Sequence, residues 1–176
     1  LTTGDGVTLN LSSGTELNTA SLVSLGGGHL NSVTMPIFSV WNAGQLTTLN
    51  DTTLGLTSGA TLNAPNLQTF RNSSVELQPG VVFNTGSLVN VDYSRITALA
   101  GYQITLGANS YTSDASVVGG HTAAFRAAGA NSLINASSMT SISNTHNSGN
   151  GWLTTFIAEN SGVLNFSSVQ AIDGGQ

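Results

Sequence analysis

Eight carboxylates are the side chains of this chain that could perform acid–base chemistry. They are Asp5, Glu16, Asp51, Glu76, Asp92, Asp114, Glu159 and Asp173. A glycoside hydrolase needs two carboxyl groups roughly 5 to 9.5 Å apart across a cleft. None of the eight has a close neighbour in sequence, so the fold would have to assemble a pair, for example Asp51 with Glu16 or with Glu76. We therefore interpret them as isolated surface acids and predict that the chain is not an enzyme.

Metal-binding patterns are equally absent from the sequence. His29, His121 and His146 stand far apart, and no His-x-His or His-x-x-x-His spacing occurs. The chain has no Cys, which removes thiolate ligands and disulfides. The calcium-binding phrase Gly-Gly-x-Gly-x-Asp is also missing. We predict neither a metal nor another cofactor.

Aromatic side chains offer a different chemistry, because Trp and Tyr combine a flat apolar ring with a polar tip. Trp41, Trp152 and Tyr93 are candidate contacts for a carbohydrate, since Ser, Thr and Asn surround them in the sequence. The alternative is that the two tryptophans fill the interior or close a corner of the fold.

The composition excludes several classes of protein. Only 11 of 176 residues are charged, the net charge is −5, and there is no basic run, so we expect no nucleic-acid partner. No apolar stretch approaches the ~20 residues of a membrane-spanning helix. Regularly spaced apolar residues nevertheless indicate a folded chain. We predict one continuous body over 1–176, either complete or part of a longer array.

A repeat gives the strongest indication of architecture. The interval from Phe125 to Phe156 is the same as the interval from Leu133 to Leu164. Looser copies begin at Leu17-Asn18, Leu30-Asn31, Leu46 and Leu62-Asn63. Two steps between these copies add up to a turn of about 30 residues, close to the interval between the phenylalanines. A fixed period of this size is typical of a solenoid, here with about six coils of about 30 residues.

Two kinds of solenoid fit the spacing of the leucines. A leucine-rich repeat would need a helix in each unit, but the Gly, Ser, Thr and Asn content disfavours helices. Alternation at 7–11, 102–106 and 163–166 favours strands. We therefore predict an all-β parallel β-helix with three short strands per coil. Strands are expected at 123–127, 154–158, 162–167 and 169–172, an irregular segment at 107–116, and a loop at 144–151.

Recurrent asparagines and the two ends of the stack have predicted roles. Asn at a corner can adopt a left-handed conformation and hydrogen-bond to the neighbouring coil. This stacking role is predicted for Asn18, Asn31, Asn63, Asn135 and Asn165. Open ends of a solenoid expose unpaired strand edges, and contacts between unlike ends that do not close produce filaments. The candidates for end-to-end assembly are Val7, Leu9, Leu11, Val169 and Ile172.

The phrase Ala-Ala-Gly-Ala-Asn-Ser-Leu-Ile-Asn-Ala-Ser-Ser-Met-Thr-Ser-Ile at 127–142 resembles repeats of secreted bacterial parallel β-helix proteins, which are adhesin-like or autotransporter-passenger-like. The resemblance extends over roughly 121–173 and is diffuse over 1–100. It implies export, a β-helix and a role at the cell surface or in the extracellular matrix. It transfers no catalytic residue.

The resulting functional hypothesis is an extracellular structural or adhesive β-solenoid. Its expected partners are further copies of itself, stacked head to tail into filaments, or other components of a biofilm matrix. The first alternative is a carbohydrate-binding or carbohydrate-active β-helix. The second is ice binding, which needs a regular threonine array, whereas Thr47-Thr48, Thr52-Thr53 and Thr154-Thr155 are irregularly placed.

Overall fold

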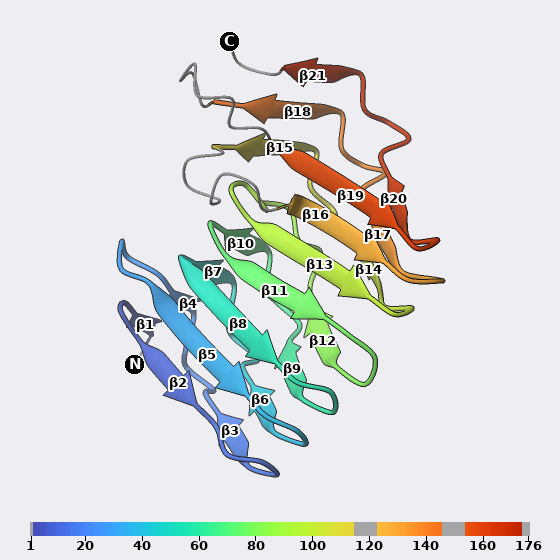
Figure 1. The fold of residues 1–176 in the computed structure, drawn as a ribbon. Helices are drawn as coiled ribbons and strands as arrows, with labels where there is room; N and C mark the ends of the chain where they lie inside the picture. Colours follow the sequence, from blue (N-terminus) through green and yellow to red (C-terminus); the bar gives the residue numbers. More distant parts are fainter. Residues whose placement is uncertain (1, 115–122, 146–153, 174–176) are drawn as a thin grey trace.

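A computed structural model describes residues 2–114, 123–145 and 154–173. Within these ranges the chain forms 21 strands and no helix, and the strands pair with one another in parallel. Most strands are only three to five residues long because Gly, Asn, Ser and Pro interrupt them at sharp turns. The strands stack into five sheets, an arrangement consistent with a β-solenoid (Figure 1).

Sheet B is the longest and contains seven strands, one from each pass of the chain. In spatial order they are β19 (Thr155–Glu159), β16 (Ala123–Ala128), β13 (Arg95–Leu99), β11 (Ser74–Leu77), β8 (Thr52–Leu56), β5 (Asn31–Met35) and β2 (Thr8–Asn10).

Four shorter sheets complete the walls. Sheet A contains β1 (Thr3–Gly4), β4 (Ser24–Leu25), β7 (Thr48–Asn50) and β10 (Thr69–Arg71). Sheet C contains β12 (Val82–Thr85), β9 (Thr61–Ala64), β6 (Val40–Asn42) and β3 (Glu16–Asn18). Sheet D contains β14 (Gln103–Thr105), β17 (Leu133–Asn135) and β20 (Val163–Asn165). Sheet E contains β15 (Ser110–Ser113), β18 (Ser141–Asn144) and β21 (Ala171–Asp173).

The chain visits these sheets in a constant cyclic order. From β2 to β12 each coil passes through sheets B, C and A, and from β13 to β21 it passes through B, D and E. Sheets D and E therefore take the places of C and A in the second half of the chain (Figure 1). The prediction of all-β parallel architecture with three short strands per pass agrees with this arrangement.

The length of a coil is shorter than predicted in the first half of the chain. Hydrogen-bonded equivalents in neighbouring coils lie 24 residues apart for Asn18 and Asn42, and 21 residues apart for Asn42 and Asn63. The separation rises to 31 residues for Thr112 and Ser143. The longer coils carry their additional residues between strands, since nine positions (114–122) separate β15 from β16, whereas two (72–73) separate β10 from β11.

The predicted half-steps between the Leu-Asn phrases are wrong. Leu17 pairs with Trp41, and Trp41 pairs with Leu62, on the inner side of sheet C. Leu30 instead lies at a corner with 81% of its surface exposed, and Leu46 is buried in the turn that follows β6. The Leu-Asn phrase therefore occurs at structurally different places, so its spacing does not measure the coil.

Two irregular segments were predicted in the second half of the chain. The one at 107–116 instead contains β15, whose Tyr111 pairs with Ile142 of β18, so the expectation of irregular structure there is wrong. Of the loop predicted at 144–151, the part from 146 onward lies outside the described residues.

The interior is a stack of apolar side chains, with one or two supplied by each strand of the middle coils. Leu49, Leu62 and Phe70 are fully buried there, and each such side chain stabilises the fold by roughly 1.5–3 kcal/mol. Near the C-terminal end the rings of Tyr111 and Phe125 approach to 4.8 Å between centroids, and Phe125 and Phe156 to 5.6 Å. The predicted strands at 123–127 and 154–158 form β16 and β19, which supply these two phenylalanines.

A column of buried polar side chains runs through the corner between sheets A and B. It consists of Asn31, Thr52, Ser73 and Ser94, each at most 4% exposed. Ser73 Oγ accepts the Thr52 backbone N–H at 3.1 Å, and Ser94 Oγ accepts that of Ser73 at 3.1 Å. Each hydroxyl also donates to a carbonyl, as Ser73 does to Arg71 at 2.8 Å. Backbone groups that the sharp turn leaves without a strand partner are thereby satisfied.

This column generates a stability prediction. Ser73→Ala removes one acceptor and one donor from a buried site, so the free energy of unfolding should fall by about 1–3 kcal/mol. The neighbour Ser74 points outward and donates to Thr53 Oγ1 at 3.3 Å. Ser74→Ala should therefore change the free energy of unfolding by no more than about 0.5 kcal/mol. Urea unfolding followed by circular dichroism measures both, and equal effects would contradict the structural role of the column.

Candidate functional site

The predicted carbohydrate-contacting aromatics lie in different surroundings. Trp41 is fully buried, and its Nε1 donates to Thr19 Oγ1 at 2.8 Å, so its ring offers no surface to a sugar. The expectation for Trp41 therefore fails, because the ring occupies the interior column of sheet C. Trp152 lies outside the described residues. Tyr93 is half-buried at the corner between sheets A and B, where the Arg71 guanidinium carbon lies 4.7 Å from its ring centroid.

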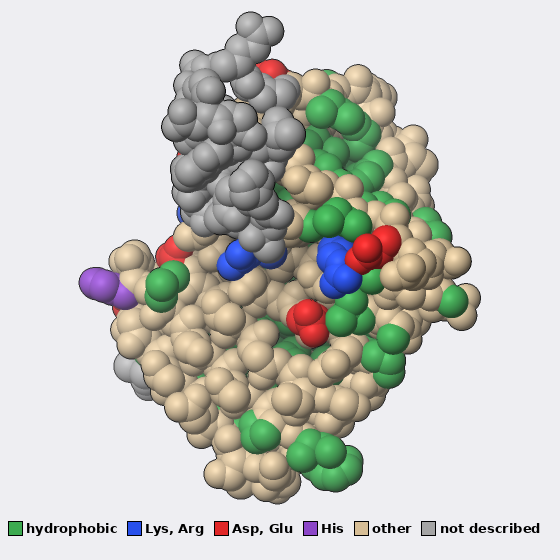
Figure 2. Space-filling view, viewed as in Figure 1, with side chains coloured by type: hydrophobic (Ala, Val, Ile, Leu, Met, Phe, Trp, Pro, Cys, Tyr) green, Lys and Arg blue, Asp and Glu red, His purple; other side chains and the backbone are tan. Residues whose placement is uncertain are grey.

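The acids are dispersed over different walls of the solenoid. Glu16 lies in sheet C and accepts a hydrogen bond from Asn42 at 2.7 Å, whereas Asp51 accepts one from Asn72 at the corner of sheets A and B. Glu159 pairs with Arg126, whose Nε donates to it at 2.7 Å. Figure 2 shows few charged side chains on the face of sheet B, where one basic and one acidic group lie in contact and the others stand apart. Over the part of the chain that the structure describes, no cluster of three or more His, Asp or Glu could hold a metal ion.

Asparagines form ladders between coils, with two members that sequence reasoning missed. Asn63 Nδ2 donates to Asn42 Oδ1 at 2.7 Å, and Asn42 Nδ2 donates to Asn18 Oδ1 at 2.9 Å. In sheet D, Asn165 Nδ2 donates to Asn135 Oδ1 at 2.9 Å. The sheet C row, in spatial order, is Asn18, Asn42, Asn63 and Asn84. A search for the residue that follows each inward apolar residue of sheet C would have found Asn42 and Asn84.

Asn31 differs from the other four predicted asparagines. Its side chain points inward and belongs to the buried corner column, where its Oδ1 accepts the Val7 N–H at 2.9 Å. The five predicted asparagines lie in strands, and none of them is among the residues with positive φ. At the corner of sheets A and B those residues are Asp51, Asn72 and Tyr93, with φ of 53°, 48° and 60°.

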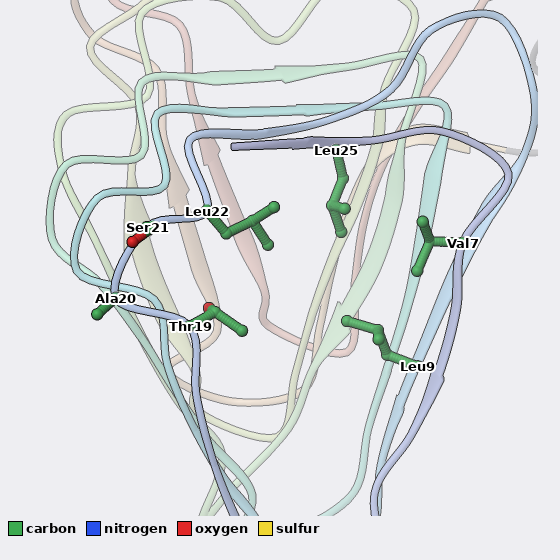
Figure 3. Close-up of a pocket in the computed structure, with 7 residues that line it drawn as sticks. All are labelled: Val7, Leu9, Thr19, Ala20, Ser21, Leu22 and Leu25. Atoms are coloured by element: carbon green, nitrogen blue, oxygen red, sulfur yellow. The ribbon is translucent and has the colours of Figure 1, made fainter. Parts of the chain in front are cut away.

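The first described coil leaves the interior open. A hollow of about 310 Å³ is lined by Val7, Leu9, Leu22 and Leu25, with Thr19, Ala20 and Ser21 at its rim. Figure 3 looks along the solenoid into this hollow, and the four apolar side chains point into the space between the walls. Gly4 lies in register with Leu25, and Leu25 and Val7 pack so closely on it that an added Cβ would come within 2.8 and 2.9 Å of them. We call this surface the N-terminal end face.

The opposite end exposes the last members of the interior columns. Phe156, Leu164 and Ile172 lie in register with the buried Phe125, Ile134 and Ile142, and we call them the C-terminal end face. Ile172 is 75% exposed although Ile142 beside it is 5% exposed. Of the remaining predicted assembly residues, Val169 and Leu11 are half-buried and pack against the core.

An ion pair joins the first two coils beside the N-terminal end face. His29 Nδ1 lies 2.7 Å from Asp5 Oδ2, and the His29 backbone N–H donates to Asp5 Oδ1 at 3.0 Å. The hydrogen bond with His29 lowers the pKa of Asp5, and the same bond raises the pKa of His29. The pair is solvent-exposed, so it orders the loop before β5 more than it stabilises the fold. The other two histidines of the sequence, His121 and His146, lie outside the described residues.

The chain matches no known family model, no curated protein and no solved structure. Among the described residues there is also no helix long and apolar enough to cross a membrane. The surfaces of the molecule that could make contacts are the two end faces and the corner between sheets A and B.

The ion pair predicts a specific dependence on pH. Because the pKa of His29 is raised, the stability that this histidine contributes to the folded state is complete below the ordinary histidine pKa of about 6.5 and is lost as pH rises through the raised pKa. Because the pKa of Asp5 is lowered, the stability that this carboxylate contributes is present above about pH 3.9 and is lost as pH falls through the lowered pKa. NMR titration of the His29 ring should show a raised pKa that returns toward about 6.5 in Asp5→Asn. An unchanged His29 pKa in that variant would contradict the pairing.

Proposed function

We propose that this chain is an extracellular structural β-solenoid that assembles head to tail through its two end faces. The observation that carries the proposal is the exposure of interior columns at both ends of the described stack. Ile172 at one end and Leu9 at the other belong to columns that are buried elsewhere in the molecule. Covering apolar surface of this kind by a second copy is favourable by roughly 25 cal/mol per Å².

The polarity of the strands supports a head-to-tail arrangement. Both end coils contain three strands that run in the same cyclic order, β1, β2 and β3 at one end and β21, β19 and β20 at the other. Placing β2 beside β19 of a second copy continues sheet B with parallel strands. The same placement brings β3 beside β20 and β1 beside β21. Because the two contacting faces are unlike, repetition of this contact yields an open filament.

The shapes of the end faces also complement each other. In this arrangement the exposed Ile172 of one copy lies in register with Gly4 of the next, beside the apolar hollow of about 310 Å³. A branched aliphatic side chain entering a hollow lined by Val7, Leu9 and Leu25 restores the packing that every interior coil has.

The asparagine ladder has a direction that suits the same contact. In the bonds between coils Nδ2 donates toward the N-terminal side of the stack, as from Asn42 to Asn18 and from Asn165 to Asn135. Asn18 of the next copy would then be placed to donate to Asn165 Oδ1. Within one chain Asn18 Nδ2 instead donates to Glu16 at 3.1 Å, and this bond would be exchanged on assembly.

The extracellular location is part of the proposal. It is supported by the resemblance of 127–142 to repeats of secreted bacterial β-helix proteins and by a composition without Cys or Lys and rich in Thr, Ser and Asn. A filament of this kind would serve as a structural or adhesive element at the cell surface or in a biofilm matrix.

Sedimentation velocity over a concentration series tests the assembly. The wild-type chain should show a weight-average sedimentation coefficient that rises with concentration, and negative-stain electron microscopy should show unbranched fibres. Ile172→Glu should abolish both effects, because a charge would have to be buried in an apolar hollow. Since Ile172 is 75% exposed, the fold should tolerate this change.

Val82→Glu provides the matched control. Val82 is 47% exposed on the lateral wall formed by sheet C, away from both end faces, so this variant should assemble like the wild type. Circular dichroism checks that both variants are folded. A wild-type chain that remains monomeric at all concentrations, or equal assembly of both variants, would refute the proposal.

A further inference from the structure

The corner between sheets A and B carries a groove that end-to-end assembly does not use. Asp51, Asn72 and Tyr93 occupy the same corner position in three successive coils, so the column spans roughly 10 Å along the solenoid. A hollow of about 210 Å³ lies along it, with Thr53, Ser74 and Arg95 on its sheet B side.

Two further hollows share walls with the first. One of about 220 Å³ is lined by Arg71, Asn72, Tyr93 and Asp114, so Asn72 and Tyr93 stand between it and the first hollow. Another of about 260 Å³ continues over sheet B and shares Thr53, Ser74 and Arg95 with the first. The three together form one interrupted groove, which suits an elongated ligand better than a single small molecule.

Tyr93 has an unfavourable backbone conformation at this point. Its φ is 60°, in the left-handed region that Asn and Asp tolerate and that a bulky aromatic residue rarely adopts. The residues above it in the column, Asp51 and Asn72, are of the tolerated types. Strained residues are concentrated at binding sites, because a functional requirement preserves a backbone conformation that lowers stability. Phe38 has the same φ, so the strain alone does not mark a site; at Tyr93 it coincides with two hollows that the residue lines and Phe38 does not.

The environment of the ring determines its orientation. The Arg71 guanidinium carbon lies 4.7 Å from the ring centroid, a cation–π contact that restricts rotation of the side chain. The Tyr93 backbone N–H donates to the Thr112 carbonyl at 2.8 Å, which anchors the corner from the other side. The ring is thus fixed before a ligand arrives, which lowers the entropic cost of binding.

The polar groups of the groove are mixed in sign. Three acids, Asp51, Glu76 and Asp114, and two arginines, Arg71 and Arg95, line the three hollows, and hydroxyl and amide groups lie between them. Such a lining matches a ligand that carries many hydroxyl groups and no net charge. A flat aromatic ring matches the apolar C–H face of a sugar ring.

We propose that this corner groove binds a neutral oligosaccharide, with one sugar ring against Tyr93 and its neighbours extending into the adjoining hollows. The site is independent of the end faces, so a filament could carry one such site per copy along its side.

Binding is tested by saturation-transfer difference NMR and isothermal titration calorimetry with a fixed panel. The panel contains malto-, cello-, manno- and chito-hexaose as neutral probes and hexagalacturonate as an anionic probe. At least one neutral hexaose should bind the wild-type chain saturably. In Tyr93→Asn the affinity for that probe should fall by about tenfold or more, because an aromatic anchor is lost.

Tyr93→Asn also separates binding from folding. Asn is favoured at positive φ, so this variant should unfold at the same or a higher temperature than the wild type. Phe38→Asn is the matched control, since Phe38 also has a φ of 60° and is 68% exposed, but it lies in the turn between β5 and β6. The affinity of Phe38→Asn for the same probe should equal that of the wild-type chain.

Three results would overturn the proposal. They are the failure of every neutral hexaose to bind, equal binding by wild type and Tyr93→Asn, and binding of hexagalacturonate alone. The last would show that the two arginines dominate the site and that its ligand is an anion.

Discussion

Parallel hydrogen bonding between coils, made in register, is the constraint from which the other features of this molecule follow. Because Leu9, Val33 and Leu54 are paired directly along sheet B, each coil must place the same kind of side chain at the same position. Apolar residues consequently stack on apolar residues, and Asn stacks on Asn. No single coil has an interior of its own, so stability comes from contacts between neighbours.

The corner of sheets A and B shows how register is maintained where no strand exists. Ser73 and Ser94 are buried there and link successive coils through the backbone of the turn. On the outer side of the same corner, Asp51, Asn72 and Tyr93 all have positive φ, which is unfavourable only for the tyrosine. A rigid polar column behind an outer column of repeated left-handed turns is an arrangement that can hold an aromatic ring in a defined place.

Much of the architecture could be predicted from sequence, but the dimensions of the first half could not. Phe125 and Phe156 are identical residues in register, so the length of their coil was visible. In the first half of the chain, the sheet B column that continues from these phenylalanines contains Leu, Val and Ile. Because the residue type changes from coil to coil, the shorter coil length could not be recognised in the sequence. Leu17 and Leu30 share a phrase but only Leu17 faces the interior. Burial of Trp41 depends on its position in sheet C, which required the correct register.

The constant length of the middle coils has a mechanical consequence. From Thr52 to Ser73 and again from Ser73 to Ser94, one coil contributes 21 residues and is held by similar short strands. Tension applied to the two ends would therefore peel coils away one after another rather than rupture the whole body at once. Each middle coil released would lengthen the chain by roughly 70 Å, taking about 3.4 Å per extended residue. Over these middle coils the molecule would extend in equal steps, as an extensible tether does.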